Sequence, residues 1–183
     1  MSERDRTKDI LLVIDMQNDF ISGELAAPEG ESIIDEVVKK INTFDGEIIF
    51  TQDTHDARYD EMNEGKHLPI EHCIKGTWGW QLHEKIAPLT RGHMVLEKPT
   101  FGSPELGAIL AGKDMTTPVR TVTLVGLVTD ICVLSNAIIA KANLPQSEIY
   151  VDAKATAGTT AEAKRTALKA LAGVHVVIVN EDV

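Results

Sequence analysis

The chain is organised around the stretch Gly126-Leu-Val-Thr-Asp-Ile-Cys132-Val-Leu-Ser-Asn-Ala-Ile138. The apolar run at residues 119–126 is rich in β-branched side chains and predicts a buried parallel strand, and the pattern from Asp130 onward indicates a helix. Cys132 then lies in the first turn of a helix, where free N–H groups and the helix dipole stabilise a thiolate. We therefore expect a nucleophilic thiol with a lowered pKa, although a lone cysteine is more often a buried apolar side chain.

Composition narrows the classes of function. A length of 183 residues fits a single domain at residues 1–183, with the polar residues 1–8 as a loose leader. The net charge of -10, without a long basic run, argues against nucleic acid or an anionic membrane as a partner, so a small molecule is expected. The chain has two cysteines, Cys73 and Cys132, and neither a secretory segment nor a membrane-spanning apolar run, which favours a cytoplasmic location and leaves a disulfide open.

Apolar periodicity predicts alternating strands and helices. Strands are expected at residues 10–15, 47–51, 93–97, 119–126, 148–152 and 174–179. Helices are expected at residues 31–44, 80–87, 103–111, 130–143 and 160–171, with Pro104 near the start of the third and Gly173 closing the last. This alternation predicts a three-layer α/β/α fold with a six-stranded, mainly parallel sheet.

Chemically reactive residues follow four of the predicted strands. Asp15, Asp53, Lys98 and Cys132 come at the ends of the first to fourth strands. Parallel sheets bind ligands at the carboxyl ends of their strands, so these side chains are expected at one edge of the sheet. An aspartate after a strand is often only a turn cap, and a lysine there is usually solvated, but four such residues at one edge are a rarer coincidence.

Three motifs resemble those of one family. They are Val13-Ile-Asp15-Met-Gln17-Asn-Asp-Phe20, Leu96-Glu-Lys98-Pro-Thr-Phe101 and the turn from Gly126 to Cys132. In this order they resemble the signatures of the isochorismatase-like cysteine hydrolases, a superfamily with a Rossmann-like fold that includes nicotinamidases. The likeness extends over residues 10–179, nearly the whole chain.

The resemblance implies a catalytic triad of Asp15, Lys98 and Cys132. The chemistry of an amidase fits it: Asp15 takes the thiol proton and later gives it to the leaving nitrogen, and Lys98 orients Asp15 and favours the thiolate. Burial raises a carboxyl pKa and a nearby ammonium lowers it, and the sequence leaves open which effect is larger for Asp15. Family members also share a cis bond that turns N–H groups toward an oxyanion, which we predict at Val128-Thr129.

A metal site is suggested by the segment that follows the second strand. Asp53-Thr-His55 places a carboxylate and an imidazole on one side of an extended backbone, and His72 follows after a loop. By chance alone, 6 histidines and 28 acidic residues often produce such spacing. Its resemblance to nicotinamidases, however, implies a divalent metal, zinc or else iron or manganese, that holds the pyridine nitrogen of the substrate.

The ligand between His55 and His72 has several candidates. Family members use either a residue at the position of Glu61 or a glutamate nearer the second histidine, which matches Glu64. We prefer Glu64, and His67 is a weaker substitute.

Further residues are candidates for the substrate pocket. Phe20, Leu68 and Phe101 are expected to wall a flat ring, Gln17 to orient the site, and Trp78 and Trp80 to shape a lid. Packing is an equally good role for all of them. Nicotinamidases often have an aromatic residue near the place of Leu68, so Leu68 departs from the pattern, and Cys73 is expected to be buried rather than catalytic.

The resemblance implies a homo-oligomeric enzyme that deamidates nicotinamide to nicotinate and ammonia through a thioester on Cys132. One alternative is another hydrolase of the family, acting on a small amide, a carbamoyl amine or an isochorismate-type substrate without a metal. The other is an inactive binding or redox-sensing module in which Cys132 is only oxidisable.

Overall fold

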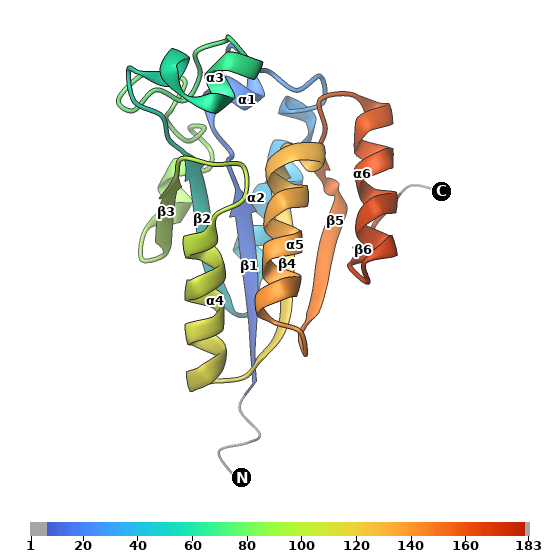
Figure 1. Ribbon diagram of the computed structural model, residues 1–183. Helices are drawn as coiled ribbons and strands as arrows, with labels where there is room; N and C mark the ends of the chain where they lie inside the picture. The colour runs from blue at the N-terminus through green and yellow to red at the C-terminus, as the bar shows by residue number, and fades with distance from the viewer. Residues whose placement is uncertain (1–6, 182–183) are drawn as a thin grey trace.

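The computed structural model describes residues 7–181, which are built on one six-stranded sheet (Figure 1). The strand order is β3-β2-β1-β4-β5-β6, and every adjacent pair is parallel, as the alternation predicted. The strands are β1 (Lys8–Ile14), β2 (Glu47–Asp53), β3 (Met94–Lys98), β4 (Val119–Leu127), β5 (Glu148–Ala157) and β6 (Val177–Val179).

Helices cover both faces of the sheet, which confirms the three-layer prediction. In Figure 1, α4, α5 and α6 lie in front of the sheet and α2 lies behind it, whereas α1 and α3 lie above the strand ends. The helices are α1 (Asn18–Ile21), α2 (Ile34–Thr43), α3 (Asn63–His67), α4 (Pro104–Thr116), α5 (Leu134–Asn143) and α6 (Ala161–Gly173). Shorter turns are η2 (Glu31–Ile33), η3 (Tyr59–Glu61), η4 (Ala87–Thr90) and the π-helical η5 (Thr129–Val133).

The central strand β1 is buried on both faces. Ile10, Leu12 and Ile14 pack into the core under α4 and α5, and Leu11 and Val13 pack into the core under α2. Each such side chain contributes roughly 1.5–3 kcal/mol of burial free energy, so truncating one is strongly destabilising. This is why β1 is a continuous apolar run rather than an alternating one.

The predicted helix at residues 80–87 is wrong. This segment forms turns and a bridge, and the 3₁₀ helix η4 begins at its last residue, Ala87. The Trp80 carbonyl, which a helix would use internally, accepts hydrogen bonds from the amides of Gln17 and Gln52 at 2.8 Å each. These partners lie 63 and 28 residues away, and a local pattern carries no sign of them.

Several boundaries also differ from the predictions. Strand β5 extends to Ala157, β6 begins only at Val177, and α4 runs on to Thr116. Residues 1–6 of the predicted loose leader lie outside the described residues, but Lys8 begins β1, and its N–H donates to the Pro118 carbonyl at 3.0 Å. Among the residues described, no helix has the length and hydropathy needed to span a bilayer.

The strand order reverses direction between β1 and β4, which sets the position of the site. At this switch point Ile14 is paired with Gly126. Gly126 has a φ of 110°, and a Cβ there would lie 2.1 Å from the Ile14 carbonyl oxygen, so only glycine fits. The carboxyl ends of both strands therefore approach closely, and the crevice beyond them is the usual ligand site of such sheets.

Candidate active site and metal centre

Asp15, Lys98 and Cys132 meet at the carboxyl edge of the sheet. Asp15 follows β1, Lys98 ends β3, and Cys132 lies in η5 after β4. Lys98 Nζ lies 2.6 Å from Asp15 Oδ2 and 3.5 Å from Cys132 Sγ. Asp15 and Lys98 are fully buried and Cys132 is 3% exposed.

Asp15 is held in place by Thr51 from the adjacent strand β2. The Thr51 hydroxyl donates to Asp15 Oδ1 at 2.6 Å and accepts from the Asp15 N–H at 3.2 Å. Burial raises the pKa of Asp15, although the Lys98 ammonium and the Thr51 hydroxyl act to lower it. In the structure, therefore, burial is the larger of the two effects that the sequence left unresolved.

The thiol of Cys132 is not activated by its helix position alone. Burial raises its pKa well above the usual range, and the ammonium of Lys98 opposes that effect. The expectation of a lowered pKa from the helix terminus is thus wrong for the closed site, because the sulfur is removed from water. A thiolate forms here only if its proton has a nearby acceptor.

The cis bond lies at Leu127-Val128, one position before the predicted Val128-Thr129. Thr129 already begins the helical turn, and the Val128 carbonyl accepts from the N–H groups of Ile131 and Val133 at 3.1 Å each. The chain changes direction where β4 ends, rather than inside the turn. Val128 remains part of the cis bond, whereas Thr129 does not.

A second cluster of donors lies beside the triad. Asp53 Oδ2 is 3.1 Å from His55 Nε2 and 3.5 Å from His72 Nε2. These three residues form a group whose donor atoms all lie within 4.8 Å of one another. Glu64 Oε1 lies beside the group, 3.6 Å from His55 Nε2 and 3.5 Å from His72 Nε2. Asp53, His55 and His72 are buried, and the side chain of Glu64 is 16% exposed.

These donors fit a divalent metal. Glu64 Oε1 is buried and has no hydrogen-bond partner, which is costly unless a cation or proton fills the space before it. His72 Nδ1 lies 2.9 Å from the Ile70 carbonyl, an arrangement in which Nδ1–H donates and the Nε2 lone pair faces the cluster. Two imidazoles with two carboxylates suit zinc, and also iron or manganese.

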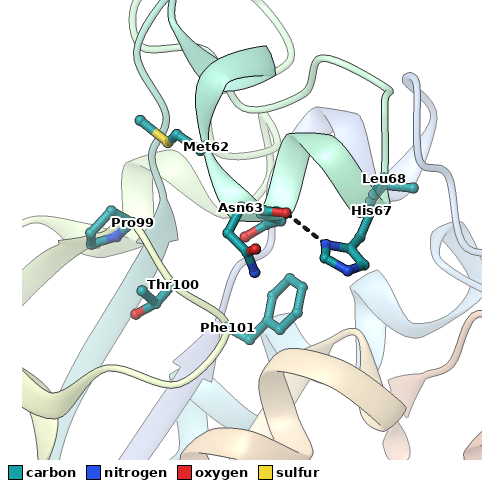
Figure 2. Close-up of a pocket in the computed structure, with 8 residues that line it drawn as sticks. Met62, Asn63, His67, Leu68, Pro99, Thr100 and Phe101 are labelled. Carbon is teal, nitrogen blue, oxygen red and sulfur yellow. Dashed lines mark hydrogen bonds between the residues drawn. The ribbon is translucent and has the colours of Figure 1, made fainter.

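The structure distinguishes between the three candidates for the ligand between His55 and His72, which are Glu61, Glu64 and His67. Glu61 lies in η3 and is exposed, and its carboxylate is not among the clustered donors. His67 is exposed, and its Nδ1 lies 2.8 Å from the Asn63 carbonyl, as the dashed line in Figure 2 shows. Only Glu64, of the three candidates, faces His55 and His72.

Asp53 belongs to both clusters. Its Oδ1 lies 3.1 Å from Lys98 Nζ, and its Oδ2 faces the two histidines. Burial acts to raise the pKa of Asp53, but Lys98 and the hydrogen bonds from His55 and His72 hold it well below the usual range. A charged carboxylate therefore connects the triad to the metal donors.

Two cavities border the site. One of about 520 Å³ lies between α3 and the loop after β3 and is lined by Glu64, Leu68 and Phe101 among others (Figure 2). Another, of about 350 Å³, is lined by Phe20, Leu68 and Val128 among others. Leu68 borders both cavities, and Phe20 packs against the His72 ring with 5.7 Å between centroids.

Gln17 borders neither cavity and is fully buried. Its amide holds Asp53, donating to the Asp53 carbonyl at 2.8 Å and accepting from the Asp53 N–H at 2.7 Å. Trp80 is tied to the same region, because its Nε1–H donates to the Thr54 hydroxyl at 2.9 Å, whereas Trp78 is exposed. Gln17 is therefore a support for a metal donor rather than a pocket wall.

A model of the isochorismatase domain matches residues 9–182. The chain belongs to the isochorismatase family. It is similar to nicotinamidase of Saccharomyces cerevisiae, with 33% identity over 42% of this chain and 49% of that protein, so the match spans about half of the yeast relative.

Two solved structures resemble nearly the whole chain. Pyrazinamidase of Pyrococcus horikoshii in complex with zinc has 27% identity and a TM-score of 0.77, covering 95% of this chain and 99% of that one. N-carbamoylsarcosine amidase of Thermoplasma acidophilum has 28% identity and a TM-score of 0.76, covering 94% and 95%.

Sequence reasoning missed several supports of this isochorismatase-family site. Thr51 was included in a predicted strand and the buried Asn136 in a predicted helix, but neither was predicted to contact the site. Asn136 Nδ2 donates to the carbonyls of Phe101 and Cys132 at 3.0 and 2.8 Å, which ties the loop after Lys98 to the turn that carries the sulfur. A polar residue amid the apolar positions of a predicted helix was the available signal.

Proposed function

We propose that this chain is a cysteine amidohydrolase that converts nicotinamide to nicotinate and ammonia. The observation that carries the proposal is the carboxylate of Asp53: its Oδ1 lies 3.1 Å from Lys98 Nζ, and its Oδ2 lies 3.1 Å from His55 Nε2 and 3.5 Å from His72 Nε2. The proposed metal donors therefore adjoin the proposed triad. The similarity to a yeast nicotinamidase and to a zinc-containing pyrazinamidase supports it.

The reaction begins with proton transfer between Cys132 and Asp15. The Asp15 carboxylate takes the thiol proton as the sulfur attacks the amide carbon, and Lys98, 3.5 Å from the sulfur, stabilises the thiolate that develops. Asp15 then gives the proton to the departing nitrogen, which leaves as ammonia. A water molecule, deprotonated by Asp15, hydrolyses the Cys132 thioester and restores the thiol.

The raised pKa of Asp15 suits its role as a proton acceptor. Because burial raises the pKa of Asp15, its carboxylate is a stronger base toward the thiol than a solvated aspartate is. Burial raises the pKa of Cys132 as well, and the ammonium of Lys98 opposes that rise. The N–H groups near Val128 and Cys132 are the proposed donors to the oxyanion of the tetrahedral intermediate.

The donors Asp53, His55, Glu64 and His72 are proposed to hold the metal. When bound, a divalent cation would act as a Lewis acid that coordinates the nitrogen of the pyridine ring. Phe101 lines the larger cavity, Phe20 the smaller one and Leu68 both, and these three side chains are the proposed walls for the ring.

A second candidate is a hydrolase of carbamoyl amines. The likeness to N-carbamoylsarcosine amidase favours it, as does an aliphatic rather than aromatic residue at Leu68. Such an enzyme uses the same triad without needing a ring nitrogen to be held.

An ammonia-release assay distinguishes the candidates. The panel contains nicotinamide, pyrazinamide, benzamide and a carbamoyl amine, and the metal content of the same sample is measured. We expect nicotinamide and pyrazinamide to react and benzamide to react poorly, with stoichiometric metal that is lost in His72→Ala. Release from the carbamoyl amine alone, by a metal-free protein, would favour the second candidate. No release from any amide, or undiminished release by Cys132→Ala, would favour a binding or redox-sensing module.

A further inference from the structure

The proposed metal donors come from three segments that differ in how they are held: the end of β2, the helix α3 that carries Glu64, and the loop that carries His72. Asp53 ends β2 and His55 follows it closely, so the sheet fixes their backbone. His72 lies on a loop between α3 and η4 that has no helix or named strand of its own. A short backbone bridge ties this loop to His55, whose N–H donates to the Cys73 carbonyl at 3.0 Å and whose carbonyl accepts from the Lys75 N–H at 2.9 Å. The Cys73 N–H, on the other side of the same residue, is held by a side chain from outside the loop.

Asp19, in the short helix α1, contacts the residue directly after His72. Its Oδ2 accepts the N–H of Cys73 at 2.7 Å, and Cys73 adopts a left-handed conformation with a φ of 48°. Asp19 is 6% exposed, and its Oδ1 accepts from the Glu24 N–H at 3.4 Å. Burying a carboxylate is costly even when N–H groups surround it, so packing alone would be better served by an apolar residue.

The loop that carries His72 packs tightly against the Asp19 carboxylate at a second point, Gly79. The Asp19 N–H donates to the Gly79 carbonyl at 3.0 Å, and a Cβ on Gly79 would lie 2.1 Å from Asp19 Oδ1. The loop therefore contacts Asp19 both beside His72 and seven residues further on. Such a contact fixes the direction in which the His72 side chain leaves the backbone.

The neighbours of Asp19 hold other parts of the same assembly. Gln17 holds the backbone of Asp53 through two hydrogen bonds, and Asn18 Nδ2 donates to the Trp78 carbonyl at 2.8 Å. The segment that directly follows β1 therefore contacts two of the three donor segments: Gln17 binds the Asp53 backbone, and Asp19 binds the loop that carries His72. Asn18 reaches only the far end of that loop and offers a matched control.

We propose that Asp19 is a positioning residue for the metal centre: by holding the Cys73 amide, its carboxylate keeps His72 Nε2 beside Asp53 and His55. This inference rests on the metal site of the proposed function. Metal affinity falls in proportion to the fraction of molecules in which the ligands are already in place, so loss of the contact weakens binding. Supporting contacts of this kind are typically worth about 10- to 100-fold in metal affinity.

Zinc affinity of the metal-free protein, measured by competition with a chromophoric chelator, tests this without any substrate. We expect Asp19→Ala to weaken zinc binding about 10- to 100-fold. Asp19→Asn should recover most of that loss, because an amide oxygen still accepts the Cys73 N–H. Asn18→Ala, which removes the contact to Trp78, should bind zinc as the wild type does.

Two results would overturn the inference: unchanged zinc affinity in a folded Asp19→Ala protein, or equal weakening in Asn18→Ala. If Asp19→Ala does not fold, Asp19→Ser is measured in its place, because the serine hydroxyl is too short to reach the Cys73 amide. The zinc affinities expected for Asp19→Ala then apply to Asp19→Ser. A wild type that binds no zinc would instead count against the metal in the proposed function. Zinc binding that is lost in His72→Ala but kept in Asp19→Ala would count against Asp19 alone.

Discussion

The two carboxylate oxygens of Asp53 contact different groups: Oδ1 pairs with Lys98, and Oδ2 lies against His55 and His72. A rigid carboxylate fixes the separation between the groups it joins to within the span of one side chain. The metal donors and the sulfur are therefore held at a set distance, which is what a small flat substrate with two points of attachment requires.

The charge of Lys98 is expected to control the reactivity of Cys132. Lys98→Met removes the cation that lowers the pKa of the thiol, so that pKa rises, and each unit of increase lowers the thiolate fraction about tenfold. Alkylation of Cys132 by iodoacetamide, followed by peptide mass spectrometry, should slow at least about tenfold at neutral pH. Cys73 is expected to stay silent, because burial raises its pKa far above the usual range.

The matched control for Lys98 is a surface lysine. Lys85 pairs with Asp35 at 2.7 Å where both side chains are exposed, so Lys85→Met should leave alkylation of Cys132 unchanged. Equal alkylation rates in Lys98→Met and wild type would show that the ammonium does not act on the thiol.

Thr51 is expected to set the acidic side of the pH profile. Its hydroxyl lowers the pKa of Asp15, so Thr51→Val raises that pKa, and the acidic limb of kcat/KM should move to higher pH. A hydrogen bond to a charged group is worth about 1.5–3 kcal/mol, so on the acidic limb, where Asp15 is largely protonated, kcat/KM should fall by about ten- to a hundredfold. Titration of kcat/KM for nicotinamide measures both effects. An unshifted acidic limb would mean that Asp15 is not the group titrating there.

At the scale of elements, the approach of β1 to β4 positions the nucleophile. Gly126→Ala places a Cβ against the Ile14 carbonyl and forces a φ that alanine avoids, so we expect a loss of several kcal/mol or failure to fold. Gly112, inside α4, has open space where a Cβ would lie, with no atom within 4 Å, and Gly112→Ala should stabilise the protein by up to about 1 kcal/mol. Chemical denaturation of both variants tests the pair. A Gly126→Ala protein as stable as wild type would contradict the close approach.

The elements that sequence could predict are those fixed by local patterns. The apolar runs of β1 and β4 and the capped start of α4, where the Ser103 hydroxyl accepts from the Leu106 N–H at 3.1 Å, are local features. The segment at residues 80–87 failed because Gln17 and Gln52 capture the Trp80 carbonyl from distant positions. The cis bond lies one residue before the predicted position. The prediction depended on where β4 ends, and that end is set by the pairing of β4 with β1 and β5 rather than by its own composition.

At the scale of the whole molecule, the strand order explains how much of the site was predictable. In a parallel sheet every carboxyl end faces the same edge, so the convergence of Asp15, Lys98 and Cys132 follows from their places after strands. The balance of burial and charge does not follow from sequence, since it depends on how completely the surrounding segments exclude water. This is why the thiol of Cys132 was expected to have a lowered pKa and instead has a raised one.

The proposed mechanism requires Cys132 to carry the acyl group of the substrate. This is measured by acid quenching during turnover of nicotinamide, followed by peptide mass spectrometry. A nicotinoyl adduct is expected on the peptide that contains Cys132 in the wild type, and neither adduct nor ammonia release is expected from Cys132→Ala. Sustained ammonia release with no adduct on that peptide, or release by Cys132→Ala at the wild-type rate, would contradict it.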